Sequence, residues 1–441
     1  MVGKVIGWVR GHLVAVVCVL VVVVSLPVAY VMSGKWDHKV REEIQKKIEG
    51  ESKKVERQNV SYSLARLSPG MEAVEVNRPP NDRVTDWFGA RLEEMRGEGE
   101  RVTAEALAFN KRGHGVLVEG LFPEPGNSDD RRLKPYEFLR ALMGYRKSPS
   151  VVDVLMERVN GGVPPDSLRV ATKLQDERTR FVADLERKRG PGQNLSEDEQ
   201  KELTAHLRES RINEYRRQAG RLGLYVDPGM LREALEIPQS EPATAPPLSH
   251  LFEKQWNVWI ASDILDAIAL ANTDERGRPM RVGEAVVKRL LSMKIKLGGT
   301  SKWNEFPYEG EETVKDRDGA RGEDGLVGVR DEMSLTGRYT HPDNDLYDVV
   351  EVRLEVIGDA TRLPRLLEAF SETNFMSVLD MDLEAVDVWK DLEDGYVYGD
   401  GSIVKATLTI ETVWLREWTV PMMPAAFREG IGAKSPAGDE G

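Results

Sequence analysis

The sequence contains a single cysteine and only six histidines. The lone Cys18 cannot form a disulfide within the chain. Val17 precedes it where a lipoprotein cleavage site needs a small residue, so we interpret Cys18 as an apolar filler. The histidines lie far apart, with none of the spacings that bind zinc. These shortages argue against a disulfide framework and against a zinc site.

The sequence also lacks the short motifs of common catalytic and nucleotide-binding sites. It has no phosphate-cradling glycine loop and no serine nucleophile elbow. Gly113, His114, Gly115 and Gly120 depart from the dinucleotide-binding fingerprint, and we interpret them as a turn with a short strand at residues 116–120. We therefore expect no enzymatic activity and no cofactor.

Positive charge is in deficit. The 441 residues include 61 Lys and Arg against 74 Asp and Glu, which gives a net charge of −13. A nucleic-acid binder needs a basic surface, so we expect no nucleic acid among the partners. Charged residues make up 31% of the sequence, which is typical of a body that faces water and not of a protein with many membrane spans.

Long hydrophobic runs are scarce, and the exception is residues 13–32, which carry no charge. A helix of this length spans about 30 Å, the thickness of the hydrocarbon layer of a bilayer. Trp8, Tyr30 and Trp36 flank the run as interfacial anchors do. The run predicts one transmembrane helix after a short tail at residues 1–12.

A cleavable signal peptide is the alternative interpretation, because Lys4 and Arg10 precede the apolar run. No Ala-x-Ala site follows, however, and the run is longer than that of a usual signal peptide. More positive charges follow the run than precede it, so charge does not fix the orientation. A short tail before a long body is typical of a signal anchor with an exported body.

Residues 36–60 predict a charged helix with a narrow apolar seam. The seam consists of Val40, Ile44, Ile48 and Val55. It covers barely two heptads and Gly50 interrupts it, so a solvated stalk helix and a coiled coil both remain open.

Residues 80–236 predict a strongly charged helical insert. The expected helices cover residues 82–97, 100–111, 135–146, 149–159, 166–189, 196–221 and 228–235. Ser196 and Glu199 have capping-box spacing at the start of one of them. The two longest helices carry few apolar residues, which indicates an extended hairpin that acts as a spacer or docking arm.

Residues 238–249 are rich in proline and predict a linker before a second module at residues 254–420. This module begins with an apolar helix at residues 254–272. Alternating strands follow near residues 291–297, 347–356, 376–388 and 403–414, with a helix at 363–370. Such an inventory predicts a ferredoxin-like α+β fold, in its usual or a permuted order, with helices on one face of an antiparallel sheet.

Residues 298–345 predict an acidic loop, and residues 421–441 a disordered tail. The loop has two sets of carboxylates that could bind calcium, namely Asp316, Asp318, Glu323 and Asp324, or Asp343, Asp345 and Asp348. Neither set fits the EF-hand template, so we interpret the segment as a solvated loop without a metal.

The layout of membrane helix, charged coil and ferredoxin-like end domain resembles the PilO and GspM proteins, bitopic inner-membrane assembly components of type IV pili and type II secretion systems. Residues 349–374 carry the resemblance: an alternating strand ends at Gly358 and leads into an amphipathic helix. That helix presents Leu363, Leu366, Leu367 and Phe370. The insert at 80–236 and the loop at 298–345 depart from the family pattern.

The resemblance implies a non-catalytic scaffold in the inner membrane, with most of the chain in the periplasm. It also implies a homodimer or a heterodimer with another bitopic assembly protein, PilN-like or GspL-like. We expect two contact surfaces, the seam in residues 36–60 and an edge strand at residues 403–412. The residues expected in that strand are Val404, Ala406, Leu408 and Ile410.

Two points remain open. Trp389, Trp414 and Trp418 are either core residues or partner contacts. The chain could instead be a membrane-tethered sensor or ligand-binding module, and a cavity between the helix at 254–272 and the sheet would favour that function. An enzyme would need polar groups gathered from distant segments.

Overall fold

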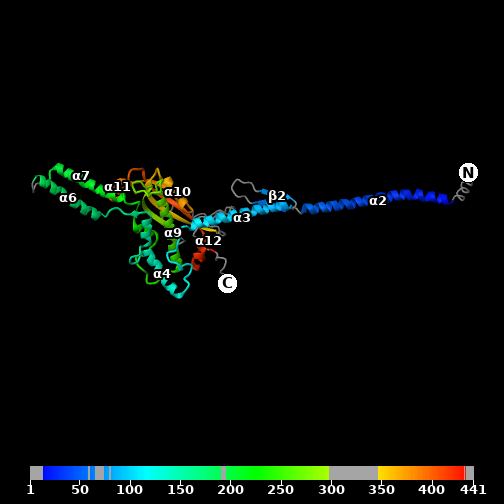
Figure 1. The fold of residues 1–441 in the computed structure, drawn as a ribbon, viewed down its shortest axis with the longest axis horizontal. Coiled ribbons are helices and arrows are strands. Elements are labelled where there is room, and N and C mark those ends of the chain that lie inside the picture. The colour runs from blue at the N-terminus through cyan, green and yellow to red at the C-terminus, as the bar shows by residue number, and fades with distance from the viewer. Residues whose placement is uncertain are drawn as a thin grey trace, which may run out of the picture. The chain divides into compact units, whose positions relative to one another are not determined.

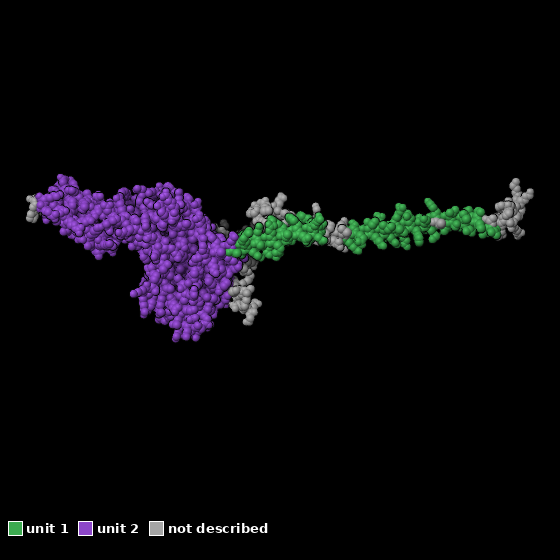
Figure 2. Space-filling model, in the orientation of Figure 1, with its two compact units in different colours: residues 1–104 green, residues 105–441 purple. Residues whose placement is uncertain are grey.

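The computed structural model describes residues 13–57, 60–64, 74–78, 81–189, 195–296, 346–431 and 433. The chain divides into two compact units, residues 1–104 and residues 105–441 (Figure 2). Both helices and strands are present, so the chain is of the mixed α+β class. The tail at 1–12, the acidic loop at 298–345 and the carboxylates proposed for calcium, except Asp348, lie outside the described residues.

The first unit begins with a single long helix, α2 (Leu13–Arg57), which continues from the apolar run into the charged segment (Figure 1). It contains Pro27 within the apolar part, and Gly50 does not end it. Proline removes one backbone hydrogen bond, a defect that a long helix with many other such bonds survives. Helix α2 is long and apolar enough at its N-terminal end to cross a membrane.

A small hairpin follows in the same unit. Strands β1 (Val60–Leu64) and β2 (Val74–Arg78) pair antiparallel. Tyr62 hydrogen-bonds Thr85 of helix α3 (Asp82–Lys111) at 2.8 Å, and its ring lies 5.1 Å from that of Phe88. Phe88 is thereby buried. The two helices expected at 82–97 and 100–111 form this one helix, whose last residues belong to the second unit.

The second unit contains five helices before its central helix. They are α4 (Ser128–Met143), α5 (Val151–Arg158), α6 (Ser167–Arg189), α7 (Glu197–Ala219) and α8 (Pro228–Ala234). The predicted capping box at Ser196 and Glu199 is present at the start of α7. Helices α6 and α7 lie side by side as a long hairpin that projects from the rest of the unit (Figure 1).

A six-stranded sheet organises the second unit. Its strands are β3 (Gly161–Gly162), β4 (Leu224–Val226), β5 (Val287–Lys296), β6 (Tyr347–Asp359), β7 (Met376–Ala385) and β8 (Ile403–Leu415). Their order in the sheet is β3-β4-β5-β6-β8-β7. The pairs β3–β4 and β4–β5 are parallel, and the remaining pairs are antiparallel.

Helices α9 (Leu248–Ala271) and α10 (Leu363–Thr373) pack against each other and against the apolar face of the sheet. Strand β6 illustrates the pattern: Val352, Leu354 and Val356 are fully buried, whereas Glu351 and Glu355 alternate with them. This period of two places one row of apolar residues against the helices. The C-terminal elements are α11 (Val388–Glu393), α12 (Arg416–Thr419), the short helix η2 (Val420–Met422) and α13 (Ala425–Gly430).

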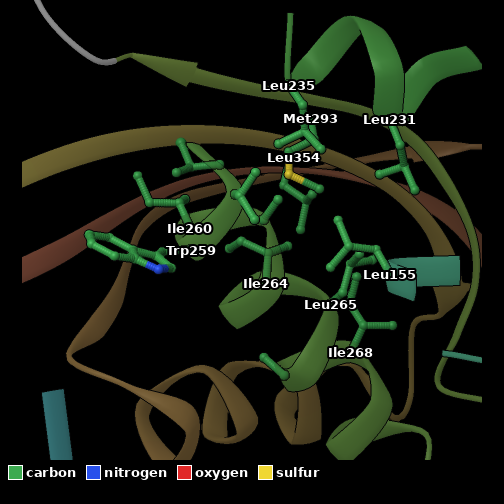
Figure 3. Packing of buried hydrophobic residues seen from close by; sticks show 14 of the residues in the cluster. Leu155, Leu231, Leu235, Trp259, Ile260, Ile264, Leu265, Ile268, Met293 and Leu354 are labelled. Carbon is green, nitrogen blue, oxygen red and sulfur yellow. The ribbon is translucent and has the colours of Figure 1, made fainter. Parts of the chain in front are cut away.

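The core of the second unit surrounds α9 on all sides (Figure 3). Ile264 and Leu265 are fully buried, as are most residues of this helix. Met293 and Leu354 approach from the sheet, and Leu155 of α5 approaches from another side (Figure 3). A helix without a polar stripe is stable only when it is enclosed, and α4, α5, α10, α13 and the sheet enclose α9.

Residues 80–236 were expected to form a helical insert, separate from the module at 254–420, and the structure differs from this expectation. Part of that segment belongs to the same core as the sheet, through buried residues such as Phe138 and Leu142 and through strands β3 and β4. Residues 238–249 likewise lie within the second compact unit. Residues 116–120 form turns and bends instead of the expected strand.

The C-terminal segment also differs from the expected disordered tail. Residues 425–430 form α13, and Met423 and Ile431 are buried in the core. Phe427 of α13 lies 5.1 Å from the ring of Phe252 in α9. Apolar side chains of this segment thus complete the enclosure of α9.

Candidate partner-binding surfaces

The apolar seam after residues 13–32 lies on a continuous helix, and its described side chains are exposed. Val40, Ile44 and Ile48 of α2 are all exposed. The side chain of Val55, the fourth expected seam residue, lies outside the described part of the structure. An ion pair between Arg41 and Asp37 at 3.0 Å lies beside the seam. Isoleucine side chains exposed every four residues on a charged helix are typical of an unpaired helical interface.

The other expected surface, strand 403–412, is not an edge of the sheet. This strand is β8, which pairs with β6 on one side and with β7 on the other. Ala406, Leu408 and Ile410 are fully buried and Val404 is half-buried. The expectation that β8 is an edge was therefore wrong: the chain folds back after β7, and β8 is inserted between β6 and β7.

The long open edge belongs to β7. Its residues are mostly exposed, including Leu379, Met381 and Leu383. They alternate with Asp380, Asp382 and Glu384. The sequence pattern of alternating apolar and acidic residues predicted this strand correctly, but the pattern alone does not reveal which strands are paired on both sides.

The three tryptophans near the C-terminus divide into two groups. Trp414 and Trp418 are buried and contact each other and Trp259 of α9 through their rings. Trp389 of α11 is 75% exposed. Trp414 and Trp418 are therefore core residues, and Trp389 alone has the exposure that a partner contact requires.

Trp389 lies at the rim of an open groove of about 890 Å³. The groove is lined by charged and aromatic residues, among them Arg216, Arg281, Glu284, Trp389, Tyr396 and Asp400. Gly399 has a φ of 77°, and a Cβ there would lie 2.5 Å from the carbonyl oxygen of Gly283. Glycine is thus required where the loop after α11 approaches the segment before β5.

Two tyrosines that line the groove, Tyr396 and Tyr398, belong to a cluster of aromatic and charged residues. The guanidinium of Arg289 lies 3.6 Å above the ring of Tyr396, and its Nη1 lies 3.5 Å from a carboxylate oxygen of Asp391. Tyr398 donates a hydrogen bond to Asp391 at 2.8 Å. Burial raises the pKa of both Tyr396 and Tyr398. The phenols therefore stay protonated at neutral pH.

A buried polar network is a feature that the sequence did not indicate. His114 Nε2 lies 2.9 Å from Asp263 of α9, and His114 Nδ1 lies 2.9 Å from the carbonyl oxygen of Asn110. The other carboxylate oxygen of Asp263 accepts a hydrogen bond from Asn374 at 2.7 Å. All four side chains are buried. The network joins residues that are up to 264 positions apart in the sequence.

Asn110, at the end of α3, connects this network to the end of β8. Its amide donates to the carbonyl oxygen of Val413 at 2.8 Å, and its Oδ1 accepts from the backbone of Leu415 at 2.8 Å and from the indole of Trp418 at 2.7 Å. Each of these polar groups has a partner and is shielded from water, which is the condition for a buried network to stabilise a fold. We interpret the network as structural: it holds the last turn of α3 against the end of β8 and against Trp418.

Three further charged side chains, Lys288, Asp348 and Arg416, are buried in the second unit. Lys288 of β5 donates to the carbonyl oxygens of Val282 at 3.1 Å and Gly283 at 3.0 Å, and burial lowers its pKa to about 8. Arg416 holds Asp348 through two nitrogens, at 2.7 and 3.1 Å. Burial raises the pKa of Asp348, and the hydrogen bonds from Arg416 act in the opposite direction. Asp348 thus has a protein partner.

Within the residues that the structure describes, no group of three or more His, Cys, Asp and Glu side chains could hold a metal ion. Asp348 is the described member of the sets considered for calcium, and it is bound to Arg416. The described residues offer three candidate sites, all of them surfaces: the seam of α2, the edge of β7 and the groove beside Trp389.

No protein-family model matches the sequence. No curated protein matches it either. A solved structure, the type 4 fimbrial biogenesis protein PilO from Pseudomonas aeruginosa, matches with 14% sequence identity and a TM-score of 0.12. The match covers 16% of this chain and 45% of the PilO chain. A similarity of this size carries no argument about fold or function.

Proposed function

We propose that this protein is a non-catalytic scaffold, anchored by one membrane span, in an envelope machine such as a pilus or a secretion system. In this proposal the body lies in the periplasm, and the span lies in the inner membrane. The protein pairs with a second bitopic assembly protein, PilN-like or GspL-like, through the seam of α2 and through the domain that contains the sheet.

The observation that carries the proposal is the exposed seam directly after the apolar segment of one continuous helix. Val40, Ile44 and Ile48 recur at spacings of four, and all are exposed while charged residues surround them. Exposed aliphatic side chains in this arrangement are covered by a second helix in coiled coils. A membrane anchor favours such pairing because it confines two helices to one plane and raises their effective concentration.

The topology of the second unit supports the same proposal. In chain order the elements around the apolar face are α9, β5, β6, α10, β7 and β8. If α9 and β5 are moved to the end of this order, the sequence of elements becomes β-α-β-β-α-β, which is that of a ferredoxin-like fold. We propose that the domain is a permuted version of this fold, extended by β3 and β4.

The test is affinity purification of the full chain from gently solubilised membranes of cells that produce the whole machine. The double variant Ile44→Asp with Ile48→Asp places two charges in the seam, and we expect it to lose the co-purified bitopic partner. The matched control Lys46→Asp changes the net charge by the same amount on the opposite side of the helix, about 200° from both isoleucines. Unchanged recovery with the double variant would refute pairing through the seam.

A second candidate function is a membrane-tethered binding module. The space between α9 and the sheet, where a cavity would favour this function, is filled by buried side chains (Figure 3). The groove beside Trp389 is the observation that favours it instead. Recovery of the chain without a protein partner, but with a small molecule that Trp389→Ala releases, would support this second function.

A further inference from the structure

Among the residues that the structure describes, the edge of the sheet formed by β7 is long and uncovered. The opposite edge is β3, which has only two residues, whereas β7 has ten. Among the described residues β7 pairs with β8 alone. Soluble proteins usually shorten or cover such an edge, because its free backbone groups can pair with another chain.

The apolar face of the sheet continues to this edge without being closed. Met381 and Leu383 lie opposite Leu408 and Ala406 of β8, which are fully buried. Met381 is 36% exposed and Leu383 is 49% exposed. Directly opposed residues of antiparallel strands point to the same face, so these two side chains extend the buried row outward. One more strand would cover their open sides.

The opposite face of β7 carries three acidic residues, Asp380, Asp382 and Glu384. Lys405 of β8 lies 3.4 Å from Glu384 and 3.5 Å from Glu355 of β6. In this row the charge alternates from negative on β6 to positive on β8 and negative on β7. Opposite charges on neighbouring strands stabilise a sheet, so the next strand outward should be positive.

The backbone of β7 has a second side that no described strand pairs with. In an antiparallel pair the residues that bond the neighbouring strand alternate with residues whose N–H and C=O face away from it, so every second residue of β7 points these groups away from β8. The N–H of Met381 donates to the carboxylate of Asp380 at 2.9 Å, so an added strand that used this N–H would have to replace that bond. The strand therefore offers backbone groups and an apolar row together.

A second copy of this chain does not fit the edge. If two β7 strands pair with their apolar faces on the same side, in either direction, acidic residues lie against acidic residues. A shift by one residue avoids this contact but turns the apolar row of one copy to the wrong face. The charges thus select a different polypeptide.

We propose that β7 binds an extended segment of another protein in which Lys or Arg alternates with apolar residues, and that this segment adds a seventh strand to the sheet. The proposal deepens the scaffold function proposed above and rests on it, because it names the partner chemistry that the sheet domain would recognise. Backbone hydrogen bonds would give affinity, and the alternating side chains would give selectivity.

Synthetic peptides of ten residues, the length of β7, test the proposal on the full chain in detergent. One peptide alternates Lys with Val, a second alternates Glu with Val, and a third is the lysine peptide with alternate backbone nitrogens methylated to prevent strand pairing. Fluorescence anisotropy of the labelled peptides measures binding. We expect the lysine peptide to bind and the other two to bind far more weakly.

The variant Asp382→Lys should weaken the lysine peptide about fivefold and strengthen the glutamate peptide, because an attractive cross-strand pair becomes repulsive. The control Glu202→Lys makes the same charge change at an exposed position of α7 and should leave both affinities unchanged. Circular dichroism of both variants tests whether they are folded.

Several outcomes would overturn the proposal. The proposal would be wrong if Asp382→Lys and Glu202→Lys had equal effects, or if the methylated peptide bound as tightly as the lysine peptide. It would also be wrong if the lysine peptide did not bind, or if the chain associated with itself and Asp382→Lys altered that association. Peptide binding does not involve the seam of α2. A failure here with intact partner recovery through Ile44 and Ile48 would therefore overturn only the added strand, whereas the reverse result would overturn the seam.

Discussion

Helices α2 and α9 are both rich in apolar residues, yet α9 is buried and α2 is exposed. Most residues of α9 are buried against the sheet and against α4, α5 and α13. The apolar residues of α2 are exposed along its length, including Leu20 and Val24. The comparison shows that apolar composition alone does not define a core. Other described parts of the chain enclose α9, whereas the apolar residues of α2 are exposed.

Length and charge distinguish the two helices at the level of sequence. The apolar run at residues 13–32 has no charged residue, whereas α9 contains Lys254, Asp263 and Asp266. Asp263 is bound within the buried network and Asp266 pairs with Arg158 at 3.0 Å. Charges inside an apolar helix indicate specific partners in the same protein, and their absence is typical of a helix in lipid.

The largest expected effect compares the same substitution in both helices. Leu265→Ala should lower the free energy of unfolding of the second unit by about 2–5 kcal/mol, because it leaves a cavity in the core. Leu20→Ala should change it by less than about 0.5 kcal/mol, because the side chain of Leu20 is exposed. Denaturant unfolding followed by tryptophan fluorescence measures both values. Similar losses would show that α2 belongs to a protein core.

A charge in the apolar run should affect membrane retention and not folding. Leu20→Arg costs about 3 kcal/mol of insertion free energy near the centre of a span. We expect a larger share of this variant in the soluble fraction after alkaline extraction, while Leu20→Ala stays with the membranes. Full retention of Leu20→Arg, together with a loss of stability of the second unit, would contradict the lipid environment of α2.

The buried Lys288 predicts a pH dependence of stability with a defined sign. Its pKa is lowered from 10.5 to about 8 in the folded protein, so the folded state releases this proton first as the pH rises. Between those values the unfolded state binds more protons, and stability increases with pH by up to about 3 kcal/mol. Lys288→Met should abolish this increase, whereas Lys46→Met on the exposed part of α2 should preserve it. Unfolding curves of the three proteins across this pH range measure the difference.

Local patterns were sufficient to predict most elements of the chain. The helices α6 and α7 agree with the predicted 166–189 and 196–221 to within two residues. The reason is that Asp166 and Ser196, which cap their first turns, are recognisable in the sequence. The strands β6 and β8 follow from strict alternation of apolar and polar residues. These features depend on neighbours in sequence, and a short window contains the information.

Pairing between distant segments could not be predicted in the same way. Strands β3 and β4 have two and three residues, too few for any periodicity, yet they extend the sheet and join the middle of the chain to its core. The position of β8 between β6 and β7 depends on topology and not on its own residues.

The buried network around His114 illustrates the same limit. Asn110, Asp263 and Asn374 come from three separate elements, and none of them belongs to a recognisable motif. The glycines around His114 predicted the turn, but nothing in that stretch indicated a buried partner in α9. The signal that could have been noticed is Asp263 itself, an acidic residue among the apolar residues of a core helix.

The hairpin of α6 and α7 can change in length without affecting the sheet domain. Each helix has 23 residues, and the hairpin is joined to the sheet domain at its base, where Arg211 bonds the carbonyl oxygen of Glu393 and Gln218 that of Val163. Farther out the two helices contact each other, as Phe181 and His206 do. Seven residues inserted into each helix would move the tip outward by about 10 Å and leave every strand in place. The length of this hairpin can therefore change while the sheet domain keeps its structure.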